Sequence, residues 1–118
     1  MTPEEFVKVV ERVVRDAAIG DSIALLEKPP GRRPRPEHVA LSSWYCALPP
    51  ADRDRVLDVV RGAIDLTVFG FLCVLDGARA IESSVPKGEL QLSYVDGGAT
   101  RLNGLDSPPL HELYRPVR

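Results

Sequence analysis

The sequence predicts an α+β fold that is mostly α, with an irregular helical body, a C-terminal β-hairpin and a short terminal helix. Three observations support it. Apolar residues recur three and four positions apart over most of the first 75 residues, as in amphipathic helices. Polar and apolar residues alternate only over residues 89–95, and Asp96-Gly97-Gly98 then supplies a hairpin turn. The tail from Asp106 to Tyr114 has the prolines and spaced leucines typical of a short capped helix.

The composition is that of a single globular domain covering residues 1–118. The chain is 44% hydrophobic and 27% charged, a balance that supports one core. Fifteen basic and seventeen acidic side chains leave a formal charge of -2, so no positive field gathers phosphates around the protein. We therefore expect no nucleic-acid partner.

The N-terminal helix is expected to begin near residue 3. Thr2 and Glu5 can form a capping box, with Pro3 at the first helical position. Its predicted core face consists of apolar residues at helical spacing, which are Phe6, Val9, Val10, Val13, Val14 and Ala17. Gly20 is predicted to end this helix in the left-handed conformation, before a short second turn.

A connector rich in proline and arginine covers residues 28–36, where four prolines and one glycine exclude regular structure. A helix is predicted from Glu37 up to the next pair of prolines, and a long helix from Pro50 or Ala51 to Leu75. Residues 66–75 are apolar on all sides, so a buried strand is the alternative for them. The helical period that continues from Val56 favours a helix with a buried end.

Asp76-Gly77 is predicted to stop the long helix, and residues 78–82 to add one further helical turn. In the hairpin, Leu90, Leu92 and Tyr94 lie on the apolar side of the alternating strand and should face the helices.

Motifs for metal or nucleotide chemistry are missing from the sequence. It contains no glycine-rich phosphate loop, and its Cys and His residues are too far apart for a zinc site, so we expect no cofactor and no metal. Cys46 and Cys73 are expected to be free thiols, with Cys73 packed in the core. His38 and His111 could act in acid–base chemistry, but the sequence names no partner group for either. No catalytic residue is assigned.

The strongest polar cluster is formed by Asp76, Arg79 and Glu82, because residues three apart on a helical turn share one face. These residues are a candidate ligand-binding or partner-binding site. The alternative is a helix cap with a surface ion-pair network. Asp65 is a second carboxylate in apolar surroundings, and its structural explanation would be a pair with Arg61.

The connector is another candidate binding site. Arg32, Arg33 and Arg35 could bind the carboxylates of an acidic partner, and the prolines between them keep the entropic cost of ordering low. A solvated loop is the alternative. Trp44 could anchor an interface, although its position in a helical stripe suits a core residue equally.

Neither a membrane span nor a secretory signal is predicted. The longest uncharged apolar run, residues 66–75, is about half of the ~20 residues needed to cross a bilayer. The segment Met1–Glu5 lacks the basic-then-apolar order of a secretory signal. We therefore expect a cytoplasmic protein without a membrane partner.

The stretch from Leu41 to Tyr114 resembles small uncharacterised bacterial proteins. The similar features are the tryptophan-bearing segment, the FGFLCVLDG end of the long helix at residues 69–77, and LHELY at residues 110–114. The resemblance implies no activity and transfers no functional residue.

The absence of a catalytic constellation favours a small non-catalytic protein-binding or regulatory protein of bacterial type, similar to an immunity, antitoxin or adaptor protein. Its partner would be another protein or a second copy in a homodimer, bound through the unpaired edges of the hairpin. The alternative is a small enzyme or ligand-binding domain with a polar site around Asp76, Arg79 and Glu82.

Overall fold

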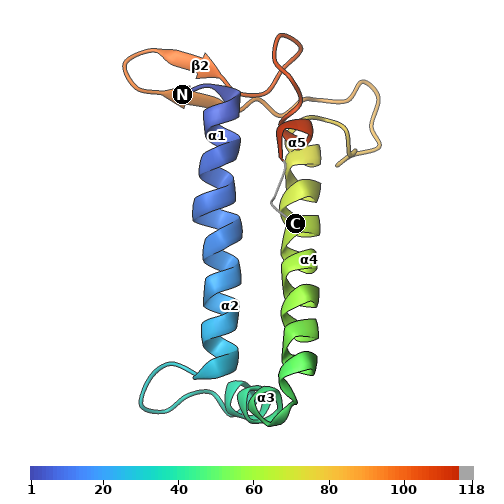
Figure 1. Ribbon diagram of the computed structural model, residues 1–118. Helices are drawn as coiled ribbons and strands as arrows, with labels where there is room; N and C mark the ends of the chain where they lie inside the picture. The colour runs from blue at the N-terminus through green and yellow to red at the C-terminus, as the bar shows by residue number, and fades with distance from the viewer. Residues whose placement is uncertain (115–118) are drawn as a thin grey trace.

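Two long helical arms run side by side in opposite directions and form the body of the protein (Figure 1). The computed structural model describes residues 1–114. The first arm is one continuous helix that consists of α1 (Pro3–Val10), the π-helical segment η1 (Glu11–Asp16) and α2 (Ala17–Glu27). The second arm is α4 (Pro50–Leu75).

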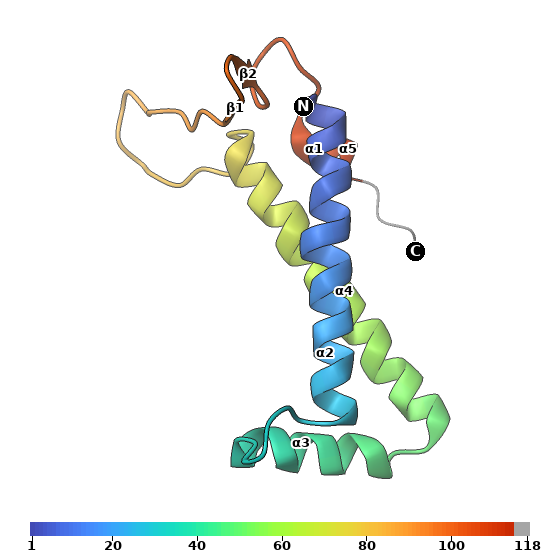
Figure 2. The same cartoon turned by 90° about the vertical axis from the view of Figure 1, so that its left-hand side faces the viewer.

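The two arms are joined and closed at opposite ends. α3 (Pro36–Ala47) lies across the base, where the first arm ends and α4 begins (Figure 2). At the other end, the antiparallel strands β1 (Ser93–Val95) and β2 (Ala99–Arg101) form a hairpin, and α5 (Leu110–Leu113) lies between the arms. The predicted α+β, mostly α fold class is therefore confirmed.

The start of the first arm is as predicted, but its end is not. Thr2 Oγ1 accepts a hydrogen bond from the backbone N–H of Glu5, and the Glu5 carboxylate accepts one from the N–H of Thr2. The predicted stop at Gly20 is wrong, because the helix continues to Glu27. Glycine costs a helix interior about 1 kcal/mol relative to alanine, and burial of the apolar residues around Gly20 offsets this cost.

The predicted core face of the first arm is only partly correct. Val7 is 1% exposed, whereas Val13 and Val14 are 54% and 48% exposed. The π-helical segment explains the difference, because its hydrogen bonds reach one residue further than those of an α-helix. This wider turn keeps Val7, Arg15 and Ile19 on the inner side and turns the two valines outward.

Residues 28–35 form an irregular connector, as predicted, and α3 follows up to the proline pair. Ser42 and Tyr45 are the buried residues of α3. Trp44 is 51% exposed, which excludes the core position that its helical stripe allowed.

α4 is helical along its whole length, so the strand alternative for residues 66–75 is excluded. Its buried end is only partly as expected. Val68 and Leu72 are buried, but Leu66 and Phe71 are 74% and 63% exposed. The reason is the elongated shape: the radius of gyration is 18.4 Å, whereas a compact domain of this length would have about 13–14 Å.

The main core lies near the end of the arms where the hairpin is. It consists of the buried residues Val7, Val68, Leu72, Leu110 and Tyr114, with Phe6, Val10, Ile64, Leu75, Leu92 and Leu113 packed against them. This core joins α1, α4 and α5. None of the helices in residues 1–114 has the length and hydropathy needed to cross a bilayer.

The stop of α4 at Asp76-Gly77 is confirmed. Gly77 has a φ of 74°, and the N–H groups of Gly77 and Ala78 donate to the carbonyls of Val74 and Cys73, respectively. This is the Schellman arrangement, which reverses the chain direction after a helix. For this reason the further helical turn predicted for residues 78–82 does not form.

The hairpin is shorter than expected and more exposed. Leu92 packs against the core, but Leu90 and Tyr94 are 41% and 40% exposed, so the prediction that all three face the helices is wrong for these two. The strands have three residues each, and the buried residues of the ribbon lie at its base, where Leu92 packs against the core and Leu102 is 2% exposed.

Candidate functional site

Asp76, Arg79 and Glu82 line one hollow of about 850 Å³ at the end of α4. The opposite wall comes from the chain around the hairpin, including Arg101 and Asp106. The structure therefore brings the three predicted residues to one place, although the helical turn that was expected to align them is absent.

Asp76 caps the short helix α5. Its Oδ1 accepts a hydrogen bond of 2.9 Å from the N–H of Leu110, and its Oδ2 accepts one of 2.8 Å from the N–H of His111. The side chain of Asp76 is 6% exposed. A four-residue helix cannot persist alone, and its first N–H groups have no acceptor within the helix. The Asp76 carboxylate supplies these acceptors and so stabilises α5.

The same carboxylate also holds the ring of His111. Nδ1 of His111 lies 2.6 Å from Asp76 Oδ2, and the ring of Phe69 meets the imidazole edge-on, with centroids 5.6 Å apart. A carboxylate in this position can orient an imidazole for proton transfer. Here the carboxylate also holds two backbone N–H groups, so its first role is to attach α5 to α4.

Glu82 and Arg79 contact other parts of the chain. Glu82 accepts hydrogen bonds from the N–H of Gly88, at 2.7 Å, and from the hydroxyl of Ser84, and so closes the loop between them. The guanidinium of Arg79 covers Gly70, where a Cβ would lie 2.6 Å from Nη1. The predicted alternative was a cap at the C-terminal end of the long helix with an ion-pair network. The Asp76 side chain instead caps the start of α5, and no ion pair joins Asp76, Arg79 and Glu82 in residues 1–114.

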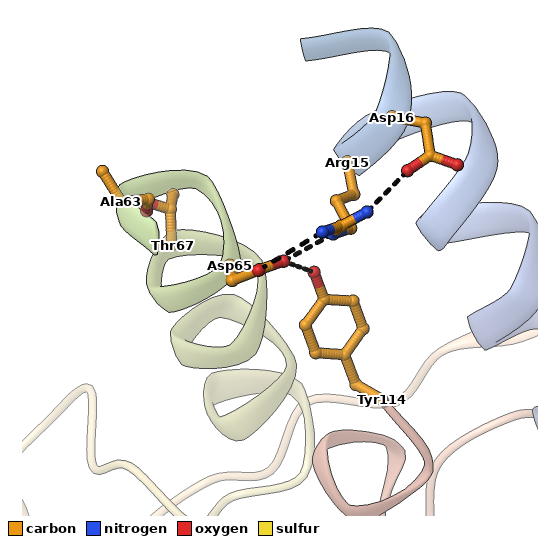
Figure 3. A network of polar contacts seen from close by, with 6 residues as sticks. All are labelled: Arg15, Asp16, Ala63, Asp65, Thr67 and Tyr114. Carbon is orange, nitrogen blue, oxygen red and sulfur yellow. Dashed lines mark hydrogen bonds and ion pairs between the residues drawn. The ribbon is translucent and has the colours of Figure 1, made fainter. Parts of the chain in front are cut away.

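Asp65 is the centre of a polar cluster that links three elements (Figure 3). Arg15 Nε donates to Asp65 Oδ1 at 2.6 Å, and the hydroxyl of Tyr114 donates to the same oxygen at 2.7 Å. Arg15 also contacts Asp16 at 2.8 Å. The partner of Asp65 is therefore on the other arm, whereas the sequence suggested Arg61.

Burial and charge shift two pKa values in this cluster. Burial, followed by the hydrogen bond to the Asp65 carboxylate, raises the pKa of Tyr114 above its ordinary value. The hydrogen bond from Arg15 to Asp65 raises the pKa of the guanidinium, although burial opposes it. Both shifts keep the two donors protonated, so the cluster holds the arms together over the normal pH range.

The arginines of the connector and Trp44 lie at the base of the molecule, far from the hollow. Arg32, Arg33 and Arg35 are exposed, and Nε of Arg35 lies 3.4 Å from the exposed carboxylate of Glu37. The 26 residues of α4, or about 39 Å of helix, separate the two ends. The predicted site residues therefore form two separate groups.

The side of α4 that faces away from the first arm carries an apolar stripe that no other part of residues 1–114 covers. We call it the outer face of α4, and it consists of Val59, Gly62, Ala63 and Leu66. Val59 and Leu66 are 72% and 74% exposed, and apart from the adjoining helix backbone no described atom lies within 4 Å of the position that a Cβ on Gly62 would occupy. Sequence reasoning expected Leu66 in the buried end of the helix and singled out neither Val59 nor Ala63, so it missed this surface.

Asn103 is a further polar residue that the sequence did not single out. It is 3% exposed. Its amide donates to the carbonyls of Leu75 and Leu90 and accepts from the N–H of Leu92 and from Arg101, which attaches the hairpin to the end of α4. No local sequence signal marks Asn103. Arg15 was not recognisable either, because α-helical spacing does not place it on the same face as Val7 and the π-helical segment does.

No group of three or more His, Cys, Asp or Glu residues among positions 1–114 is arranged to hold a metal ion. Cys46 is exposed and Cys73 is buried, and both are free thiols as expected.

Comparisons with family models, with curated proteins and with solved structures found no match for this chain.

Proposed function

We propose that this chain is a small non-catalytic protein-binding protein of bacterial type, similar in role to an immunity, antitoxin or adaptor protein. Its uncovered surface carries the proposal. The accessible surface is 8557 Å², roughly 2,200 Å² more than a compact monomer of this mass would expose. A stable complex buries only about 800 Å² of each partner, so the excess is large enough for an interface.

Much of this surface is apolar. Large hydrophobic side chains that are at least about two-fifths exposed occur on both arms and on α3, and they include Val13, Val14, Leu41, Trp44, Val59, Leu66 and Phe71. Monomeric proteins rarely leave large apolar patches in water, and such patches usually mark interaction sites. The polar clusters, in contrast, are engaged within the chain, as the contacts of Asp76 and Asp65 illustrate.

Site-specific photo-crosslinking tests the proposal. A photoreactive amino acid replaces Leu66 in the native host, and a second strain carries it at the exposed Arg12 on the first arm. We expect one adduct of defined mass from position 66 only, with the attached protein identified by mass spectrometry as another protein or as this chain.

The identified partner is then purified and titrated. Leu66→Lys should weaken binding at least about tenfold, as loss of a central interface anchor does. Val39→Lys, a matched change of an exposed apolar residue on α3, should change it less than about twofold. The absence of an adduct at position 66, or equal adducts at both positions, would overturn the proposal.

A ligand-binding or enzymatic role is the second candidate, because Asp76, Arg79 and Glu82 share one hollow. A ligand of that hollow should raise the melting temperature of the wild type and not that of Arg79→Ala. If a panel of small anions and metabolites produces no such difference, this candidate is excluded.

A further inference from the structure

We infer that the occupant of the outer face of α4 is a second copy of this chain, packed antiparallel around a two-fold axis at the middle of α4. The inference rests on the proposed function and names the partner for the same surface. Four observations support it: the symmetry of the stripe, the small residues at its centre, the charge balance of α4 and the area available.

The stripe is self-complementary when α4 is reversed. α4 spans Pro50–Leu75, and its midpoint falls between Gly62 and Ala63. Val59 and Leu66 lie equally far from this midpoint on its two sides. In a two-fold antiparallel pair, a residue before the axis meets the residue at the same distance after it. Val59 of one copy would therefore pack on Leu66 of the other, twice per dimer.

The centre of the stripe allows two helices to approach closely. Gly62 has no side chain, Ala63 has only a methyl group, and the space above Gly62 is open. The distance between packed helices depends on the side chains at the contact, so small residues at the crossing bring the flanking Val59 and Leu66 into contact. Their three- and four-residue spacing is that of a helix-packing seam.

The charges of α4 do not oppose this pairing. Its first half carries three acidic and three basic side chains, which are Asp52, Asp54, Asp58, Arg53, Arg55 and Arg61. In an antiparallel pair this neutral half lies along the second half of the partner's α4, whose charged residue, Asp65, is paired with Arg15, so no like charges are brought together along α4.

The surface available exceeds the requirement of a dimer. The excess of roughly 2,200 Å² belongs to the elongated chain as a whole, and covering about 800 Å² of each copy, as an interface of standard size does, would remove only part of it. The hairpin offers less, because each of its strands has three residues. We therefore place the contact between copies on α4.

Sedimentation analysis of the full chain tests the inference. We expect a species of twice the 12.9 kDa chain mass that dissociates on dilution. Leu66→Lys and Gly62→Gln should each weaken dimerisation at least about tenfold, because each change occurs twice in a two-fold interface. Gly62→Gln improves helix propensity, so its loss of dimer cannot be attributed to unfolding. Val39→Lys should leave the dimer unchanged.

Disulfide trapping tests the orientation. Val59→Cys and Leu66→Cys are made in separate chains that also carry Cys46→Ser, which removes the exposed native thiol. A disulfide-linked dimer should form rapidly when the two chains are mixed and slowly when either is oxidised alone. A parallel pair would link Val59→Cys to itself and would overturn the proposed arrangement.

Two further results would overturn the inference. A chain that stays monomeric at all concentrations excludes the second copy as the occupant. In that case, an adduct between position 66 and a different protein leaves the proposed function intact, whereas no adduct at all overturns both. A dimer that persists in Leu66→Lys but dissociates in Ser93→Pro is formed by the hairpin and not by α4.

Discussion

Asp65→Asn should strongly destabilise the protein, because it removes the charge that links the two arms and the end of the chain. The side chain of Arg15 is 12% exposed and that of Asp65 is 23% exposed, so solvent screens the pair only partly. Tyr114, which donates its hydroxyl proton to Asp65, is 6% exposed. In the variant, both donors would lose their charged acceptor.

The expected magnitude follows from these contacts. Removal of one partner from a buried ion pair costs about 3–5 kcal/mol. The amide of asparagine keeps one acceptor oxygen and the site retains some water, so we expect a loss of about 2–3 kcal/mol in the free energy of unfolding. For a chain of this length, this corresponds to a melting temperature lowered by roughly 10 °C.

Urea unfolding followed by far-UV circular dichroism measures the loss. Asp58→Asn is the matched control, because Asp58 is on the same helix with an exposed side chain 3.8 Å from Arg55, and its change should stay below about 0.5 kcal/mol. The double variant Arg15→Gln/Asp65→Asn should cost less than the sum of the single changes, since each of them already breaks the pair. If Asp65→Asn is as stable as Asp58→Asn, the assigned role of the cluster is refuted.

Further predictions concern the tyrosine, the core and the thiols. Burial raises the pKa of Tyr114 above its ordinary 10.0, so the stability that its protonated hydroxyl contributes is complete below pH 10.0 and is lost as the pH rises further. Tyr114→Phe should therefore reduce the loss of stability at alkaline pH, measured by unfolding curves over a pH series. An unchanged dependence of stability on pH would contradict this prediction. Leu72→Ala should cost about 2–5 kcal/mol by urea unfolding, because Leu72 is 1% exposed, and a negligible shift of the midpoint would mean that its face is not in the core. Cys46 should react with a thiol reagent in the native protein and Cys73 only on unfolding, so rapid native labelling of Cys73 would disprove its burial.

Local signals in the sequence correctly predicted the start of α1, the end of α4 and the hairpin turn. Thr2 and Glu5 form their capping box, Gly77 ends α4, and the turn that joins β1 and β2 lies at the predicted position. Each of these features depends on residues only a few positions apart, so the local geometry of the backbone is enough to determine it. The failed stop at Gly20 shows the limit of such signals, because tertiary packing around a weak helix former outweighs its propensity.

The candidate site was predictable only in part. The sequence placed Asp76, Arg79 and Glu82 on one helical turn; that turn does not form, but the three residues still line one hollow. It could not predict that Asp76 would cap α5 from 34 residues away. It also placed Arg32, Arg33, Arg35 and Trp44 as candidates without showing that they lie at the other end of α4.

By itself, then, the sequence determined which segments are helical, where most of them begin and end, and which of their faces are apolar. Only the tertiary structure decided which apolar face is covered, and which polar groups meet. Val59 and Val68 belong to the same apolar helix, yet one is 72% exposed and the other 8%. Asp65 finds Arg15 across 50 residues of chain. The spacing of apolar residues shows which side chains share one face of a helix, whereas burial and ion pairing depend on which distant element packs against that face.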